Sequence, residues 1–184
     1  RSNRQSDAHN RTAAASPPNS HFSLVSTIGH SEVGDLFVRG APASTGTEQM
    51  AESGNTSTLV TEMAAGSTVA AQNVSSTAIF GAGSHTLTMT LSQDASLIST
   101  VTMLAPGIDW FVGMRDQSMF QNGTWVSRVE RNLANYDSGT DSGAAFDSAN
   151  SDTNPRSVVS GLSDPAFIAA AAEGSFVRTL IERI

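Results

Sequence analysis

Hydrophobic residues in this chain recur mainly at every second position, in short runs that are separated by turn-forming residues. The runs at 21–28 and 85–92 alternate most clearly, with Leu87, Met89 and Leu91 on one side of the second run. Alternation with a period of two predicts β-strands that are buried on one face. Further strands are expected from short β-prone runs at 35–40, 78–80, 96–104, 109–114, 124–133 and 175–184.

Helical periodicity is scarce, and one tight turn stands out. The segment 44–55 predicts a short helix, because Thr45 and Glu48 have the spacing of a capping box and Gly54 can end the helix. The alanine-rich run at 164–174 is compatible with one or two helical turns. The dipeptide Asn122-Gly123 between two β-prone runs predicts a two-residue hairpin.

About eight short strands with one or two short helices predict an all-β fold, an antiparallel β-sandwich. Residues 1–20 show no hydrophobic period and end near Pro17-Pro18, so we expect a polar, basic N-terminal arm there. Residues 21–184 are then the folded domain.

Charge excludes one class of partner. The chain has 17 acidic and 10 basic residues and a net charge of −7, and all the basic residues are arginine. Arg1, Arg4 and Arg11 against Asp7 give the arm +2, which leaves −9 for residues 21–184. Nucleic acid is not expected as a partner, because phosphate neutralisation needs a basic face. No run reaches the length of a membrane span, and the absence of cysteine excludes disulfides and thiolate metal sites.

Two kinds of catalytic or metal site find little support. The run "GHSEV" at 29–33 begins like the nucleophile elbow of a serine hydrolase, but Val33 stands where the turn needs glycine. No two histidines have the spacing of zinc ligands on one helix face. We therefore expect no enzyme.

Carboxylates crowd the loop "DSGTDSG" at 137–143, where no basic residue accompanies them. Asp137 and Asp141 flank a turn rich in glycine, and such a loop can offer the oxygen ligands that calcium requires. On spacing alone, two aspartates four residues apart in a loop are more often solvated than bound to a metal. Asp109 is a candidate third carboxylate, because an aspartate beside Trp110 and Phe111 needs a partner for its charge. Hydrogen bonding to turn amides is its other possible role.

Several of these runs occur together in a known family. "DWFVGM" at 109–114, "NGTWV" at 122–126, "NYDSGTDSG" at 135–143 and "FVRTLIERI" at 176–184 resemble, in this order, the spondin N-terminal domain family of F-spondin, mindin and their bacterial relatives. The resemblance extends from about Phe22 to Ile184. It implies a C2-like β-sandwich with one calcium ion at an end, held by Asp109, Asp137 and Asp141. Ile108 and Ser138 depart from the family's usual residues, but neither removes a ligand.

The resemblance favours a secreted, non-enzymatic, calcium-binding module for extracellular adhesion or matrix interaction. Its partners would be a calcium ion and an extracellular protein or glycan surface. An alternative is a structural subunit of an extracellular filament or surface assembly, in which the basic arm of one copy contacts the acidic body of the next. The partner would then be another copy of the chain.

Overall fold

The structure is a computed structural model that describes residues 19–146, 148–162 and 177–183. Two helices lie within these ranges, α1 (Thr45–Ser53) and α2 (Ser57–Ala65). The strands are β1 (His21–Phe22), β2 (Ser26–His30), β3 (Val69–Val74), β4 (Ile79–Phe80), β5 (Leu97–Ala105), β6 (Trp110–Ser118), β7 (Phe120–Gln121), β8 (Thr124–Trp125), β9 (Arg128–Asn132), β10 (Ala134–Asp137), β11 (Ser160–Gly161) and β12 (Arg178–Glu182).

The main sheet has eight strands and is antiparallel throughout. Its longest path is β11-β10-β6-β5-β1-β4, and β2 pairs with both β5 and β3. Two small sheets, β12-β9 and β7-β8, complete the described strands. The prediction of an all-β antiparallel sandwich with about eight strands and short helices is therefore confirmed.

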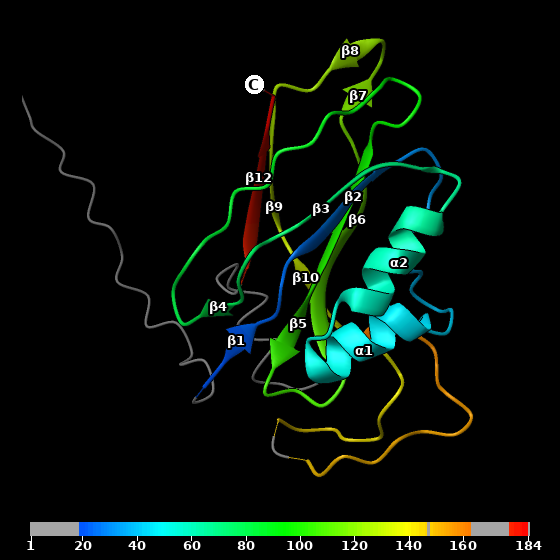
Figure 1. Cartoon of the computed structure of the whole chain (residues 1–184), viewed down its shortest axis with the longest axis vertical. Coiled ribbons are helices and arrows are strands. Elements are labelled where there is room, and N and C mark those ends of the chain that lie inside the picture. The colour runs from blue at the N-terminus through cyan, green and yellow to red at the C-terminus, as the bar shows by residue number, and fades with distance from the viewer. Residues whose placement is uncertain (1–18, 147, 163–176, 184) are drawn as a thin grey trace, which may run out of the picture.

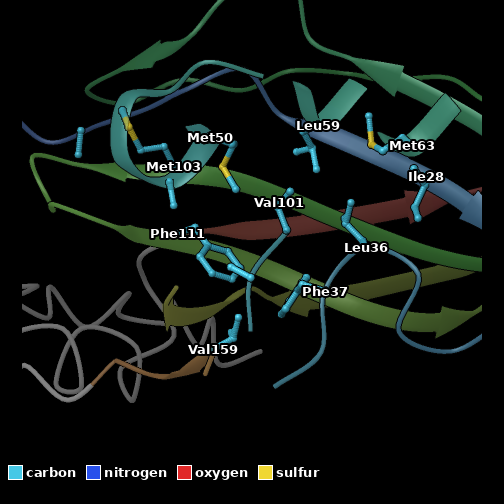
Figure 2. Packing of buried hydrophobic residues seen from close by; sticks show 13 residues of the cluster. Ile28, Leu36, Phe37, Met50, Leu59, Met63, Val101, Met103, Phe111 and Val159 are labelled. Carbon is cyan, nitrogen blue, oxygen red and sulfur yellow. The ribbon is translucent and has the colours of Figure 1, made fainter. Parts of the chain in front are cut away.

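Both faces of the main sheet are covered (Figure 1). On one face, helices α1 and α2 contribute Met50, Leu59 and Met63 to a core that Figure 2 shows against Val101 and Phe111. On the other face, a second core packs against β9 and β12. Its buried members are Ile98, Leu104, Trp110, Val112, Met114, Met119, Val129, Leu133 and Leu162. The sheet is thus the middle layer of the molecule.

Two turn predictions are confirmed by the backbone. Asn122 and Gly123 have φ values of 52° and 76°, which is the left-handed geometry that a type I′ hairpin requires, and they connect β7 to β8. Gly54 ends α1 in the left-handed region, where its N–H donates to the carbonyl of Met50. The N-cap of α1 is Ser44, one residue before the predicted capping box, and its Oγ accepts from Thr47 N–H at 3.1 Å.

Other local predictions were wrong. Residues 85–92 form no assigned strand, although their exposure alternates as predicted. Residues 35–40 form a loop, because Leu36 and Phe37 are buried by the core without pairing. The first run divides into β1 and β2, and β2 is buried at every residue since its sheet is covered on both faces. Helix α2 was not predicted, and the predicted helix at 164–174 lies outside the described residues.

The described helices are all too short or too polar to cross a membrane.

Candidate metal centre

Strand pairing brings the two predicted acidic segments together. Asp109 directly precedes β6, and Asp137 is the last residue of β10, opposite Trp110 in the antiparallel pair. The next residue, Ser138, donates its N–H to the carbonyl of Asp109 at 3.1 Å. Figure 1 shows the β5–β6 connection, the segment after β10 and α1 at the same end of the sheet. Residue 109 and the segment that begins at residue 137 therefore lie side by side in the fold.

Asp109 is the most buried of the three predicted ligands, with no exposed surface. One carboxylate oxygen, Oδ2, accepts from Thr140 N–H at 2.9 Å, Asp141 N–H at 3.0 Å and the hydroxyl of Ser138 at 3.1 Å. The other, Oδ1, is buried and has no hydrogen-bond partner among the described residues. Asp109 thus holds the 138–141 turn with one oxygen and leaves the second unsatisfied.

Asp137 is half-buried and caps the following turn. Its Oδ1 accepts from Gly139 N–H at 2.8 Å. Gly139 has φ 75°, and a Cβ there would lie 2.8 Å from the carbonyl carbon of Ser157. Only glycine suits this position, since a side chain would meet both backbone strain and a backbone contact. The turn therefore orients the Asp137 carboxylate next to Asp109.

Asp141 is buried, and its carboxylate accepts from amides of its own loop. Its Oδ1 accepts from Gly143 N–H at 2.7 Å, and its Oδ2 accepts from Ser151 N–H. The loop closes on itself through Thr153, whose N–H donates to the carbonyl of Thr140 at 2.8 Å. Each carboxylate oxygen has two acceptor positions, so an amide on each leaves Asp141 with further capacity to accept or to bind a cation.

Sequence reasoning missed a further acidic group at this end of the sheet. Glu52, in the last turn of α1, is hydrogen-bonded to the side chain of Thr140, and charge repulsion from Asp109 and Asp152 acts on it. The spacing of residues within α1 contains no information about the loop that its end will meet. The only local indication was Gly54, which predicted where the helix stops.

Carboxylates dominate the electrostatics of this cluster. Burial, together with the charges of Asp109 and Asp141, raises the pKa of Asp137 from 3.8 to about 6, despite the hydrogen bond from Gly139. Burial and the charges of Glu48, Asp152 and Asp109 also raise the pKa of Glu52. Arg156, which lies in the same loop, pairs with Glu48. The described carboxylates therefore repel one another at neutral pH.

The donor chemistry fits a hard divalent cation such as calcium, because every group offered is an oxygen and Asp109 Oδ1 is buried without a partner. As the side chains stand, no three His, Asp or Glu residues in the described part of the chain are grouped closely enough to hold a metal ion. The carboxylate of Asp141 is instead hydrogen-bonded to Gly143 and Ser151.

The raised pKa of Asp137 predicts an unusual pH dependence of the metal-free protein. An acid whose folded pKa of about 6 exceeds its ordinary 3.8 stabilises the fold fully below about 3.8, and this contribution is lost as the pH rises through 6. Because Asp137 is partly solvated, we expect a contribution of about 1 to 2 kcal/mol. In chelator, Asp137→Asn should therefore be more stable than the parent at pH 7.5 by that amount, as measured by urea denaturation.

The difference should shrink towards zero as the pH falls below about 3.8, because Asp137 is then protonated in both the folded and the unfolded state. Asp94→Asn is the matched control, since Asp94 is exposed and lies outside the cluster. Equal effects of the two substitutions at pH 7.5 would contradict the proposed repulsion.

The structure also places a second polar group that sequence reasoning missed. His30 is fully buried, and its Nε2 lies 2.8 Å from the hydroxyl of Ser99. Its Nδ1 donates to the carbonyl of Glu32 at 2.7 Å and lies 3.2 Å from Asp35 Oδ2. Ser31, the candidate nucleophile of the "GHSEV" run, is turned to the carbonyl of Thr68 instead.

Comparisons with known proteins match this chain to one family. The family model described as Spondin_N matches residues 6–175. Mouse Spondin-1 is 27% identical over 179 residues, which cover 89% of this chain and 22% of that protein. Rat Spondin-2 is 35% identical over 79 residues, which cover 43% of this chain and 24% of that protein. Chicken Spondin-1 is 28% identical over 144 residues, which cover 74% of this chain and 18% of that protein. The chain thus matches about a quarter or less of the length of these relatives.

Proposed function

The chain belongs to the Spondin_N family, whose relatives Spondin-1 and Spondin-2 are secreted extracellular matrix proteins, and on this premise we propose a calcium-binding function for it. In this proposal, the protein is a secreted, non-enzymatic module for extracellular adhesion or matrix interaction. Its calcium ligands are Asp109, Asp137 and Asp141.

One observation carries the calcium proposal: the buried carboxylate of Asp109 has an oxygen without a partner, inside a cluster of other carboxylates. An unpaired buried charge is costly unless a counter-charge or hydrogen bonds compensate it. Amides and a hydroxyl compensate Oδ2 of Asp109 only. A divalent cation would supply the missing charge and accept the remaining oxygen as a ligand.

A calcium ion bound at this site would order the surface loop beside it. When bound, calcium would neutralise the repulsion between Asp109 and Asp137. Asp109 already ties the 138–141 turn to the start of β6, and Glu52 ties the same turn to α1. Residues 149–158 follow on this turn and are largely exposed, with Val158 44% exposed. The cation would therefore order a loop that an extracellular protein or glycan can contact.

The buried histidine supports the non-enzymatic part of the proposal. His30, Ser99 and Asp35 have the residue types of a hydrolytic triad, but Ser99 is only 1% exposed. Its hydroxyl oxygen also accepts the backbone N–H of Asp116 at 2.9 Å, so it connects β5 to the irregular part of β6. A nucleophile must reach a substrate carbonyl, and this hydroxyl lies inside the sheet. Its role is to satisfy buried polar groups.

Thermal unfolding tests the calcium site directly. A ligand that binds only the folded state stabilises it, by about 1.4 kcal/mol at a tenfold excess over its Kd, which for a domain of this size raises Tm by about 4 °C. We expect calcium to raise Tm relative to chelator, and we expect Asp137→Asn to abolish the increase. Isothermal titration calorimetry with calcium chloride checks the same site without unfolding.

Asp94→Asn should keep the full response to calcium, because Asp94 is exposed and distant in sequence from the three ligands. The calcium assignment is wrong if parent Tm is the same in calcium and in chelator and calorimetry detects no heat of binding. Loss of the response in Asp94→Asn would instead indicate a general effect of net charge.

A further inference from the structure

One stretch of the chain lacks charged residues entirely. Between Glu62 and Asp94, the 31 residues from Met63 to Gln93 include no Asp, Glu, Lys or Arg, although the chain as a whole carries a net charge of −7. This stretch contains β3, β4 and the segment 85–92. We refer to residues 69–92 as the uncharged edge. Figure 1 shows the segment that follows β4 running along the side of the molecule away from the helices.

The uncharged edge contains strands with an open side. Among the described strands, β3 pairs only with β2 and β4 pairs only with β1. Phe80, in β4, is 73% exposed and stacks on His21 with ring centroids 4.9 Å apart. Open strand edges present N–H and C=O groups to which another strand can pair, and most proteins protect them with charges or proline.

The segment 85–92 has the side-chain pattern of a strand without a strand's partner. Leu87, Met89 and Leu91 are half-buried, whereas Thr86, Thr88 and Thr90 are exposed. Apart from helices and paired strands, none of the backbone-to-backbone hydrogen bonds between described residues involves residues 81–91. Its carbonyl at Thr88 accepts from the side chain of Asn73 at 2.8 Å, which holds the segment beside β3.

Side-chain packing against the sheet holds residues 85–92 in place. Leu91 contacts the second core, and a Cβ on Gly29 would collide with the Leu91 side chain. The absence of a side chain at Gly29 therefore lets residues 85–92 lie directly on the sheet. With its apolar side anchored, the segment can present its backbone groups to solvent or to another chain.

The small sheet β12-β9, in contrast, carries charged side chains. Strand β9 carries Arg128, Glu130 and Arg131, and Arg128 forms an ion pair with Glu182 of β12 at 2.8 Å. Charges on such strands oppose pairing with another molecule. The same molecule thus has one charged pair of strands and one uncharged edge, so the absence of charge is local.

We propose that the uncharged edge is a self-association surface, at which residues 85–92 of one molecule pair antiparallel with residues 85–92 of a second copy. The segment is β-prone, uncharged and free of proline and glycine, a composition that favours strand-to-strand pairing. Antiparallel pairing of identical segments is two-fold symmetric, so both copies use the same surface.

Electrostatic repulsion favours the uncharged edge as the place where a second copy of the chain can approach. Two molecules with a net charge of −7 repel one another, and the repulsion is weakest where both present uncharged residues. This contact differs from the predicted arm-to-body contact in its salt dependence. Salt screens the net repulsion and strengthens pairing through the uncharged edge, whereas it weakens an attraction between a basic arm and an acidic body.

Sedimentation velocity and light scattering on the full chain test the proposal. We expect a mass that rises with concentration towards twice the 19.1 kDa of one chain, and more readily at high salt. Thr88→Arg combined with Thr90→Arg should weaken association by at least about tenfold, because the arginines of two paired copies would face one another. Both threonines are exposed, so the folded state should keep its Tm.

Thr124→Arg is the matched control and should associate like the parent, since Thr124 is exposed on β8, outside the uncharged edge. A single-chain mass at every concentration overturns the proposal. Association that salt weakens, or that the double arginine variant retains, also overturns it. The measurements are repeated in calcium and in chelator, and association in both shows that this surface acts independently of the metal site.

Discussion

Replacing Asp109 by alanine is expected to lower the free energy of unfolding by about 3 to 4 kcal/mol in the absence of calcium. The substitution removes the oxygen that accepts from Ser138, Thr140 and Asp141 within a fully buried site. Each buried donor that loses its partner costs about 1 to 3 kcal/mol. Removal of the charge also relieves repulsion on Asp137 and Glu52, which offsets only part of this loss.

Asp109→Asn separates the two effects. The amide retains an oxygen that can accept from the turn but carries no charge, so we expect a smaller loss of about 1 to 2 kcal/mol. The pKa of Asp137 should then fall below its present value of about 6, since the charge of Asp109 contributes to raising it. Urea denaturation measures the stabilities, and NMR titration of the Asp137 carboxyl carbon measures the pKa. Alanine and asparagine variants of equal stability would contradict the hydrogen-bonding role of Asp109.

Replacing Gly46 by alanine is expected to destabilise the protein by about 3 kcal/mol, although alanine is the better helix former. Gly46 lies in the first turn of α1, where α2 approaches so closely that a Cβ would be 2.5 Å from Leu59 Cα and 2.6 Å from Leu59 N. Both contacts are with backbone atoms, so no side chain can rotate away. The gain in helix propensity of about 1 kcal/mol is smaller than the cost of separating two packed helices.

Thr45→Ala provides the control for Gly46→Ala, because Thr45 is the neighbouring residue in α1 and is exposed. We expect it to change the free energy of unfolding by less than about 0.5 kcal/mol. Gly46→Ala should also disturb the contact in which Glu62 of α2 accepts from Gly46 N–H at 2.9 Å. A Gly46→Ala variant as stable as the parent in urea denaturation would show that the helices can move apart at little cost.

The contrast between residues 122–123 and residues 85–92 shows what local patterns can predict. Asn-Gly forms its turn with few other residues involved, and the hairpin is present as predicted. Residues 85–92 have the same alternation as a strand, but pairing requires a neighbour with open hydrogen-bonding groups. The segment instead lies against the sheet through Leu91 and forms no assigned strand. Alternation therefore predicted which side is buried but not whether a partner exists.

The candidate site divides in the same way. Asp137 and Asp141 could be identified from their own loop, because glycine and serine between unpaired carboxylates predict a tight acidic turn. Asp109 was linked to them through its aromatic neighbours and the family resemblance. Nothing within α1 indicated that Glu52 would join the cluster, or that His30 would meet Ser99, since these contacts join segments far apart in the chain.

The amino-acid sequence by itself determined the family, the all-β class, the Asn-Gly hairpin, the helix that ends at Gly54 and the acidic loop. These features depend on motifs or on interactions among residues a few positions apart. Only the tertiary structure decided that β10 pairs with β6, which places Asp109 on the 138–141 turn, and that β3 and β4, in the uncharged stretch after Glu62, each pair with a single described strand. Such pairings follow from burying both faces of one sheet at once, a condition that involves the whole chain.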